Sequence, residues 1–132
     1  MHAQCQCGQL SAEISGPSDA ISACHCLDCQ RRSGSPFGVI AYFPADRVSV
    51  AGEATTYTRY TDSGATFTTG FCPDCGATVW ARADKHPTLL GVPVGAFADP
   101  AFSPPLRSVF EASRHAWVQM PADIPRYPCG RS

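Results

Sequence analysis

Residues 24–37 read Cys24-His25-Cys26-Leu27-Asp28-Cys29-Gln30-Arg31-Arg32-Ser33-Gly34-Ser35-Pro36-Phe37. This stretch places three cysteines within six residues, follows them with two adjacent arginines, and ends in a turn of Gly, Ser and Pro. Cysteines one or two residues apart are badly placed to form a disulfide with each other, but they are well placed to bind one metal ion. The stretch therefore predicts a zinc thiolate site with a substrate pocket beside it.

Two further cysteine pairs lie on either side of this stretch in the sequence: Cys5 with Cys7, and Cys72 with Cys75. The second pair is followed by Gly76, which is typical of a knuckle whose backbone amides can point at the sulfurs. Together the two pairs supply four sulfur ligands, a closed tetrahedral set of the structural kind. A metal bound there would contribute directly to the free energy of folding.

The remaining clustered cysteines, Cys24, Cys26 and Cys29, have no obvious fourth protein ligand. Three protein ligands with one open position are typical of a catalytic zinc site. The open position could hold water or a substrate thiol, whose proton the metal would displace at neutral pH. We therefore interpret these three cysteines as the catalytic residues. His25 lies between two of them and is expected to support or pack against the site rather than to bind the metal.

A second pairing of the cysteines is also compatible with the sequence. The pair Cys26 and Cys29 could join the pair Cys72 and Cys75 in a four-cysteine zinc ribbon, which would leave the three other cysteines before residue 26 as spare thiols. Spacing alone does not fix which cysteines share a metal. We prefer the first pairing, because it leaves no closely spaced cysteines without a metal. The lone Cys129, in a Pro-rich tail, is expected to be a bystander.

Polar side chains that follow the third cysteine are candidates for substrate binding. Arg31 and Arg32 carry planar guanidinium groups that can hold a carboxylate bidentately, although they fit a solvated helix face or a salt bridge with Asp28 equally well. Ser33 and Ser35 could add hydroxyl and backbone N–H donors, or could belong only to a turn. The sequence predicts these two arginines and two serines as the substrate-binding residues.

The length and composition are those of an ordinary globular domain. A chain of 132 residues can bury a core without covalent staples, and we expect one domain over residues 1–132. A formal net charge of -1 and few adjacent basic residues predict no nucleic-acid partner. We find no secretory segment and no apolar run long enough to cross a membrane, so the expected location is the cytoplasm, with no membrane partner. Eight cysteines in a reducing compartment fit metal ligands better than disulfides.

Short runs of Thr, Val and aromatic residues, separated by Gly and Pro, predict a mainly β fold. One short helix is expected over Leu27 to Ser33, ended by Gly34. Strands are expected over residues 10–14, 37–43, 47–50, 55–60, 66–71, 77–82, 89–94 and 107–112.

The cysteine groups and the end of the chain form a recognisable pattern. It comprises Cys5-Gln6-Cys7-Gly8; Cys24-His25-Cys26 with Cys29, Arg31, Gly34 and Ser35; Phe71-Cys72 with Cys75-Gly76; Val109-Phe110-Glu111-Ala112-Ser113-Arg114; and Trp117 with Asp123-Ile124-Pro125-Arg126-Tyr127. In order and approximate spacing this pattern resembles the glutathione-dependent formaldehyde-activating enzyme family, which is related to the centromere protein V type. The resemblance covers nearly the whole chain.

The resemblance implies a complex β zinc-binding fold of the Mss-four-like kind, with two zinc ions as cofactors. It implies that the two flanking cysteine pairs hold a structural zinc, and that Cys24, Cys26 and Cys29 hold a second, functional zinc. At that second zinc, glutathione reacts with formaldehyde to give S-hydroxymethylglutathione, which makes such a protein a carbon-sulfur lyase. The implied partner is a small-molecule thiol, glutathione or an analogue.

Our leading hypothesis is a cytoplasmic zinc protein that binds a small thiol and forms or breaks a carbon-sulfur bond. The alternative is a non-catalytic module, stabilised by zinc, that carries a thiol or binds a protein partner. A module that binds a protein partner predicts a second metal site with all its coordination positions filled and no response to thiols. The sequence does not predict an oligomeric state.

Overall fold

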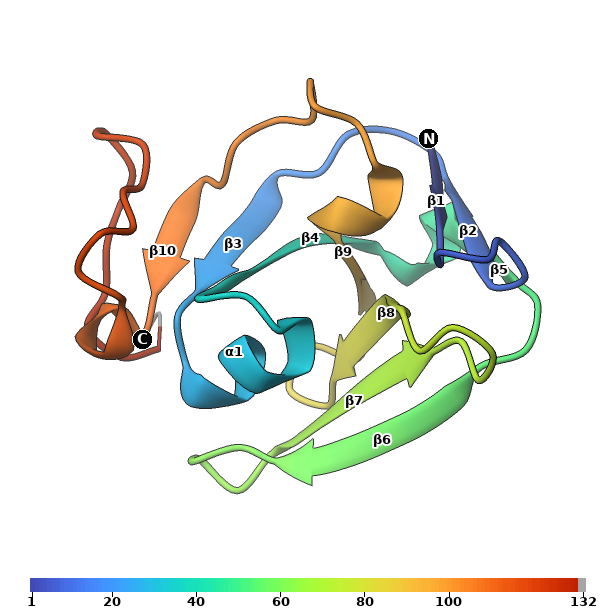
Figure 1. Ribbon diagram of the computed structural model, residues 1–132, viewed down its shortest axis with the longest axis horizontal. Coiled ribbons are helices and arrows are strands. Elements are labelled where there is room, and N and C mark those ends of the chain that lie inside the picture. The colour runs from blue at the N-terminus through green and yellow to red at the C-terminus, as the bar shows by residue number, and fades with distance from the viewer. Residues whose placement is uncertain (131–132) are drawn as a thin grey trace.

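The computed structural model describes residues 1–130, most of which form strands and the turns between them (Figure 1). This confirms the mainly β fold predicted from the sequence. Residues 131 and 132, which end the predicted domain, lie outside the described residues. In chain order the elements are β1 (His2–Gln4), β2 (Ser11–Ile14), β3 (Ala20–Cys24), α1 (Leu27–Ser33), β4 (Gly38–Pro44), η1 (Ala45–Arg47), β5 (Val48–Ala51), β6 (Thr55–Tyr60), β7 (Thr66–Phe71), β8 (Thr78–Ala83), β9 (Leu89–Pro93), η2 (Val94–Phe97), β10 (Arg107–Val109) and η3 (Glu111–Ser113).

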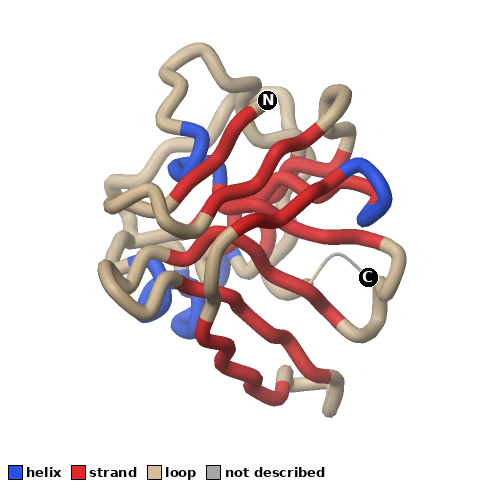
Figure 2. Tube along the Cα trace, turned by 90° about the vertical axis from the view of Figure 1, so that its right-hand side faces the viewer, coloured by secondary structure: helices blue, strands red, loops and turns tan. Residues whose placement is uncertain are grey.

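The strands form two sheets, one of seven strands and one of three. The large sheet has the order β10-β3-β4-β9-β8-β7-β6, in which β10 runs parallel to β3 and the other neighbours are antiparallel. The small sheet has the order β1-β2-β5. Figure 1 shows β10 and β6 as the outer strands of the large sheet, and Figure 2 shows the strands of the two sheets from the side.

Apolar side chains from both sheets form the main core. Leu10 and Ile14 from the region of the small sheet are buried together with Ile21, Phe43 and other side chains of the large sheet. The cluster also contains two cysteines, Cys5 and Cys72, at full or nearly full burial. Burial of these apolar groups provides the main driving force for folding, and it joins one cysteine group directly to the core.

Helix α1 has the bounds that the sequence predicts, because both of its ends are capped. The Cys26 sulfur accepts a hydrogen bond from the Cys29 backbone N–H (3.3 Å) at the first turn. Gly34 ends the helix in a left-handed conformation (φ 72°), which glycine adopts without steric cost. One predicted metal ligand, Cys26, is therefore the N-cap of the helix.

Apart from shifts of one residue at strand ends, the observed strands differ from the predicted ones at β1, β3 and β10. Strands β1 and β3 were not predicted, since both are short and carry small or polar residues beside cysteines. The last predicted strand, over residues 107–112, ends at Val109, because Phe110 takes a left-handed conformation (φ 55°) that a strand does not tolerate. No helix within residues 1–130 is both long enough and apolar enough to cross a membrane.

Candidate metal centres and the adjoining cavity

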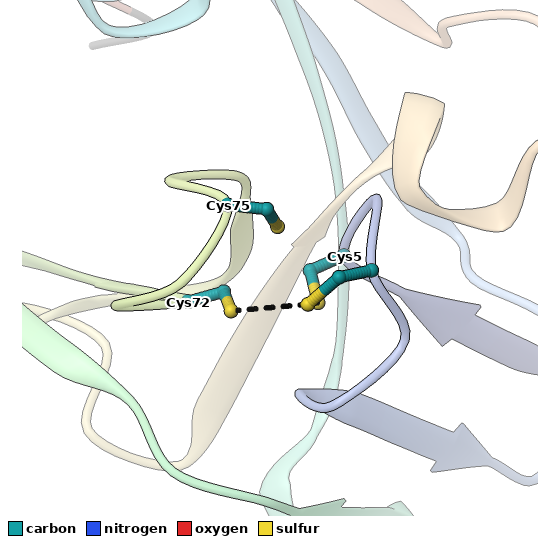
Figure 3. Close-up of side chains that lie close together, drawn as sticks. Cys5, Cys72 and Cys75 are labelled. Atoms are coloured by element: carbon teal, nitrogen blue, oxygen red, sulfur yellow. Dashed lines mark hydrogen bonds between the residues drawn. The ribbon is translucent and has the colours of Figure 1, made fainter.

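The first cysteine cluster contains Cys5, Cys7, Cys72 and Cys75, whose sulfurs all lie within 4.8 Å of one another. The Cys5 and Cys7 sulfurs are 3.7 Å apart, and those of Cys7 and Cys72 are 3.6 Å apart. A tetrahedral zinc ion with Zn–S bonds of about 2.3 Å would hold its sulfurs about 3.8 Å apart. Figure 3 shows Cys5, Cys72 and Cys75 converging from two separate loops. The donor set and its spacing therefore fit a zinc ion.

Backbone amides in both loops point at these sulfurs. The Leu10 N–H donates to the Cys5 sulfur (3.4 Å), and the Asp74 N–H donates to the Cys72 sulfur (3.3 Å). The turn after the second pair closes through a hydrogen bond from the Gly76 N–H to the Cys72 carbonyl (2.8 Å). Gly76 has φ 80°, which explains why a glycine follows the last cysteine. These donors stabilise the thiolate form that a metal requires.

A side chain that the sequence analysis did not single out also contacts this cluster. Gln9 donates through Nε2 to the Cys72 sulfur (3.1 Å) and to the Glu53 carbonyl (2.6 Å), and its Oε1 accepts from the Glu53 N–H (3.1 Å). Burial raises the pKa of the Cys72 thiol, but the Gln9 and backbone N–H donors outweigh it and lower that pKa to about 6. Nothing in the sequence marks Gln9, because its partners are distant in the chain.

The second cluster contains Cys24, Cys26 and Cys29, whose sulfurs also lie within 4.8 Å of one another. Cys24 ends β3, Cys26 caps α1, and Cys29 lies within α1. Hydrogen bonds from the other two thiols lower the pKa of Cys26 and raise that of Cys24, so one of the three carries a favoured thiolate. The structure brings the thiols together in the preferred grouping and does not place Cys26 and Cys29 in one cluster with the pair at 72 and 75; that each cluster binds its own zinc ion stays a prediction.

A cavity of about 340 Å³ opens beside the three-cysteine cluster. Its walls come from α1 and from six of the seven strands of the large sheet, including both edge strands. The lining side chains that can bind metal, protons or anions include Cys24, Cys26, Cys29, Tyr42, Arg59 and Arg107. The cavity thus connects the incomplete metal site to two cationic side chains.

Tyr42 is the aromatic hydroxyl in the cavity wall. Gly91, on the neighbouring strand, leaves room for its ring: a Cβ atom there would lie 2.9 Å from the Tyr42 ring and 2.6 Å from Ile40. Burial, followed by the negative charge that Cys29 and Cys24 carry when they are deprotonated, raises the pKa of Tyr42 to about 12. The hydroxyl therefore keeps its proton at neutral pH and can donate a hydrogen bond.

The substrate residues predicted from the sequence lie outside this wall. Arg31 is exposed. Arg32 lies against Gly38: a Cβ atom added to that glycine would be 2.5 Å from the Arg32 Nη2 atom. Ser33 donates to the Phe37 carbonyl (3.3 Å) and accepts from the Ser35 N–H (3.1 Å). Arg32 and Ser33 line a second cavity, which shares Gly38 with the first. The assignment of these four residues to substrate binding stays a prediction.

His25 is fully buried between two cysteines of the second cluster. Its Nε2 lies 2.9 Å from the Ser108 hydroxyl, which in turn lies 2.5 Å from Oε2 of Glu111. Since the single Ser108 proton goes to the carboxylate, His25 Nε2 is the donor to Ser108. The His25 carbonyl accepts from the Ser113 hydroxyl (2.8 Å) and from the Gln30 side chain (2.9 Å). The C-terminal segment thus holds the backbone between Cys24 and Cys26, and His25 supports the site as predicted.

Comparison with known proteins gives a consistent result. Residues 1–119 match the family described as glutathione-dependent formaldehyde-activating enzyme. Two curated proteins that carry this enzyme's name are similar: one from Talaromyces marneffei is 34% identical over 67% of this chain, and one from Penicillium rubens is 33% identical over 64%. The chain spans about half the length of these relatives, 48% and 45% respectively. A crystal structure of a Rhodobacter sphaeroides protein, 20% identical, has the same fold, with a TM-score of 0.59 over 96% of this chain and 99% of that one.

Proposed function

The chain belongs to the glutathione-dependent formaldehyde-activating enzyme family, and on that basis we propose that it binds a small thiol and forms or breaks the carbon-sulfur bond of its S-hydroxymethyl adduct. The thiol is glutathione or an analogue, and the activity is that of a carbon-sulfur lyase. The observation that carries this proposal is the cavity of about 340 Å³ that opens onto Cys24, Cys26 and Cys29. We also propose that the protein works in the cytoplasm and without nucleic acid.

Both metals are proposed to be zinc. Four clustered thiols form a complete tetrahedral set of the structural kind, whereas three thiols beside a cavity leave one position for another ligand. Zinc held by the three cysteines would supply a positive charge that keeps a bound thiol in its thiolate form at neutral pH. Cys24, Cys26 and Cys29 are in this sense the proposed catalytic residues.

The reaction needs a proton at one defined place. When the thiolate sulfur attacks formaldehyde, the new C–S bond forms and the carbonyl electron pair moves to oxygen, which then takes up a proton. Tyr42 is protonated at neutral pH and lies in the cavity wall, so its hydroxyl can donate a hydrogen bond to that oxygen. Contacts from Arg31, Arg32, Ser33 and Ser35 remain proposals, supported by their position directly after Cys29.

The test is a calorimetric titration of zinc-quantified protein with glutathione, repeated on Cys26→Ser and Cys75→Ser. We expect Cys26→Ser to lose thiol binding and remain folded, and Cys75→Ser to lose stability, because its cluster joins the core. Equal unfolding of both variants would contradict the division between a structural and a functional site. The rate of formaldehyde adduct formation, with and without protein, then separates a catalyst from a carrier of the thiol.

A further inference from the structure

Arginines from both edge strands of the large sheet line the cavity beside the three-cysteine cluster. Arg59 lies on β6 and Arg107 on β10, which are the first and last strands in the sheet order. The sheet therefore curves until residues from its two edges line one cavity. Figure 1 shows these two strands at opposite ends of the sheet, with α1 in the region between them. The same wall carries two carboxylates, Asp28 and Asp62, so the pairing of each arginine decides whether it can bind a ligand anion.

The charge of Arg59 is already partly neutralised. Its Nη1 lies 3.3 Å from a carboxylate oxygen of Asp28, which also lines the cavity. Its guanidinium carbon lies 4.9 Å from the centre of the Phe67 ring, a cation–π contact. Two protein partners thus hold Arg59 in place, and its remaining capacity for an anion is reduced.

Arg107 has a different environment. Its Nη1 donates to the Ser22 hydroxyl (3.3 Å), a neutral group that also lines the cavity. Within residues 1–130, no carboxylate lies within 4.0 Å of its guanidinium. A half-buried guanidinium without an anionic partner loses part of its hydration and gains most when a ligand supplies the anion. Arg107 is therefore the better placed of the two arginines to bind one.

Strand pairing gives the position of Arg107 relative to the metal site. In the parallel pair of β10 and β3, Arg107 is opposite Ser22 and Val109 is opposite Cys24. Residues two apart on a strand face the same side of the sheet and are separated by about 6.6 Å along it. Arg107 and Cys24 therefore face the same cavity, one step of two residues apart. A ligand that contacts both needs its sulfur and its anion several bonds apart.

We propose that Arg107 determines the substrate class, by binding a carboxylate of a thiol whose sulfur lies at the three-cysteine cluster. The role given to the thiol rests on the proposed function. The role given to the carboxylate rests on the cavity, on the strand register and on the guanidinium of Arg107, which has no carboxylate partner among the described residues. The proposed ligand is a thiol with a carboxylate several bonds from its sulfur. Neutral thiols of similar size should bind more weakly.

The test compares glutathione with its dimethyl ester, which keeps the thiol and removes both carboxylate charges. Binding of each is measured by calorimetry to the zinc-loaded protein and to Arg107→Gln. Loss of one charge-assisted hydrogen bond weakens binding about tenfold or more. We expect that loss for glutathione in Arg107→Gln, and no further loss for the ester. Arg82→Gln is the matched control, because Arg82 is exposed, stacks on Trp80 and does not line the cavity.

Folding of each variant is checked by circular dichroism and by its zinc content. If Arg107→Gln does not fold, Arg107→Lys replaces it, because Lys keeps the charge but lacks the bidentate geometry. A third ligand, S-methylglutathione, keeps the carboxylates and lacks the free thiol.

The outcomes separate this inference from the proposed function. If glutathione and its ester lose affinity equally in Arg107→Gln, or neither does, the assignment of Arg107 is overturned while thiol binding stands. If the wild-type protein binds S-methylglutathione as tightly as glutathione, and Arg107→Gln weakens both, the carboxylate site stands and the thiol role of the cysteines fails. If the wild-type protein binds none of the three ligands, both proposals are overturned.

Discussion

Replacement of Ser108 by alanine should destabilise the protein without touching either cysteine cluster directly. Ser108 is fully buried, and its hydroxyl bridges His25 Nε2 (2.9 Å) and Glu111 Oε2 (2.5 Å). The change removes one hydrogen bond to a charged group and one to a neutral imidazole, and leaves His25 Nε2 with only the more distant Oε2 of Glu111 (3.5 Å). The sum is a loss of about 2 to 4 kcal/mol in the free energy of unfolding.

Urea unfolding of the zinc-loaded protein measures this loss. With an m-value of about 2 kcal/mol/M, the midpoint should fall by about 1 to 2 M. Ser49→Ala is the control, since Ser49 lies exposed on β5 and forms no side-chain hydrogen bond within the described part of the chain. We also expect weaker metal binding at the second cluster in Ser108→Ala, because His25 lies between two of its ligands. A midpoint within about 0.25 M of the wild-type value, equivalent to about 0.5 kcal/mol, would refute the bridging role of Ser108.

Three further outcomes are expected. Gly70→Ala should lower the free energy of unfolding by about 1 to 3 kcal/mol, measured by thermal melting, because a Cβ atom there would lie 2.0 Å from the Trp80 ring. Gly95→Ala is the control: its Cβ atom would meet nothing within 4 Å, so its melting temperature should be close to that of the wild type. Gln9→Ala should weaken metal binding at the four-cysteine cluster and not at the three-cysteine cluster, because it removes the side-chain donor to Cys72. Competition with a chromophoric chelator measures both sites, and equal weakening at the two would contradict this expectation. Removal of metal from both clusters should unfold the chain around the four-cysteine cluster, because Cys5 and Cys72 belong to the core. The near-ultraviolet circular dichroism signal should be lost and should return when zinc is added. A native spectrum in the metal-free protein would show that the apolar core folds the chain without metal.

The grouping of the cysteines could be predicted from the sequence because each loop supplies its ligands within a few residues. Cys5 and Cys7 share one turn, and Cys72 and Cys75 share another, so only the pairing of the loops required the fold. The bounds of α1 were predictable for the same reason, since its capping groups, Cys26 and Gly34, are local. Local geometry is what a sequence specifies most directly.

The charged groups of the cavity could not be predicted in this way. Arg59 and Arg107 lie on strands at opposite edges of one sheet, and only the curvature of that sheet brings them to one cavity. Each is an isolated arginine in a short strand, a pattern that fits a solvent-exposed position equally well. Arg31 and Arg32 attracted the prediction because they are adjacent to the cysteines in sequence, although neither lines the cavity that opens onto those cysteines.

The titratable side chains next to the second cluster in the sequence make contacts with other residues. His25, which lies between two of the cysteines, donates its Nε2 proton to Ser108 and is not part of the cluster. Asp28, one residue before the last cysteine, pairs with Arg59. His25 Nδ1 has no hydrogen-bond partner among the described residues, yet His25 does not join the cluster. The placement of these side chains, and not only their contacts, therefore leaves the three sulfurs without a fourth protein ligand from residues 1–130, and a metal held there would have one position open to a ligand from the cavity.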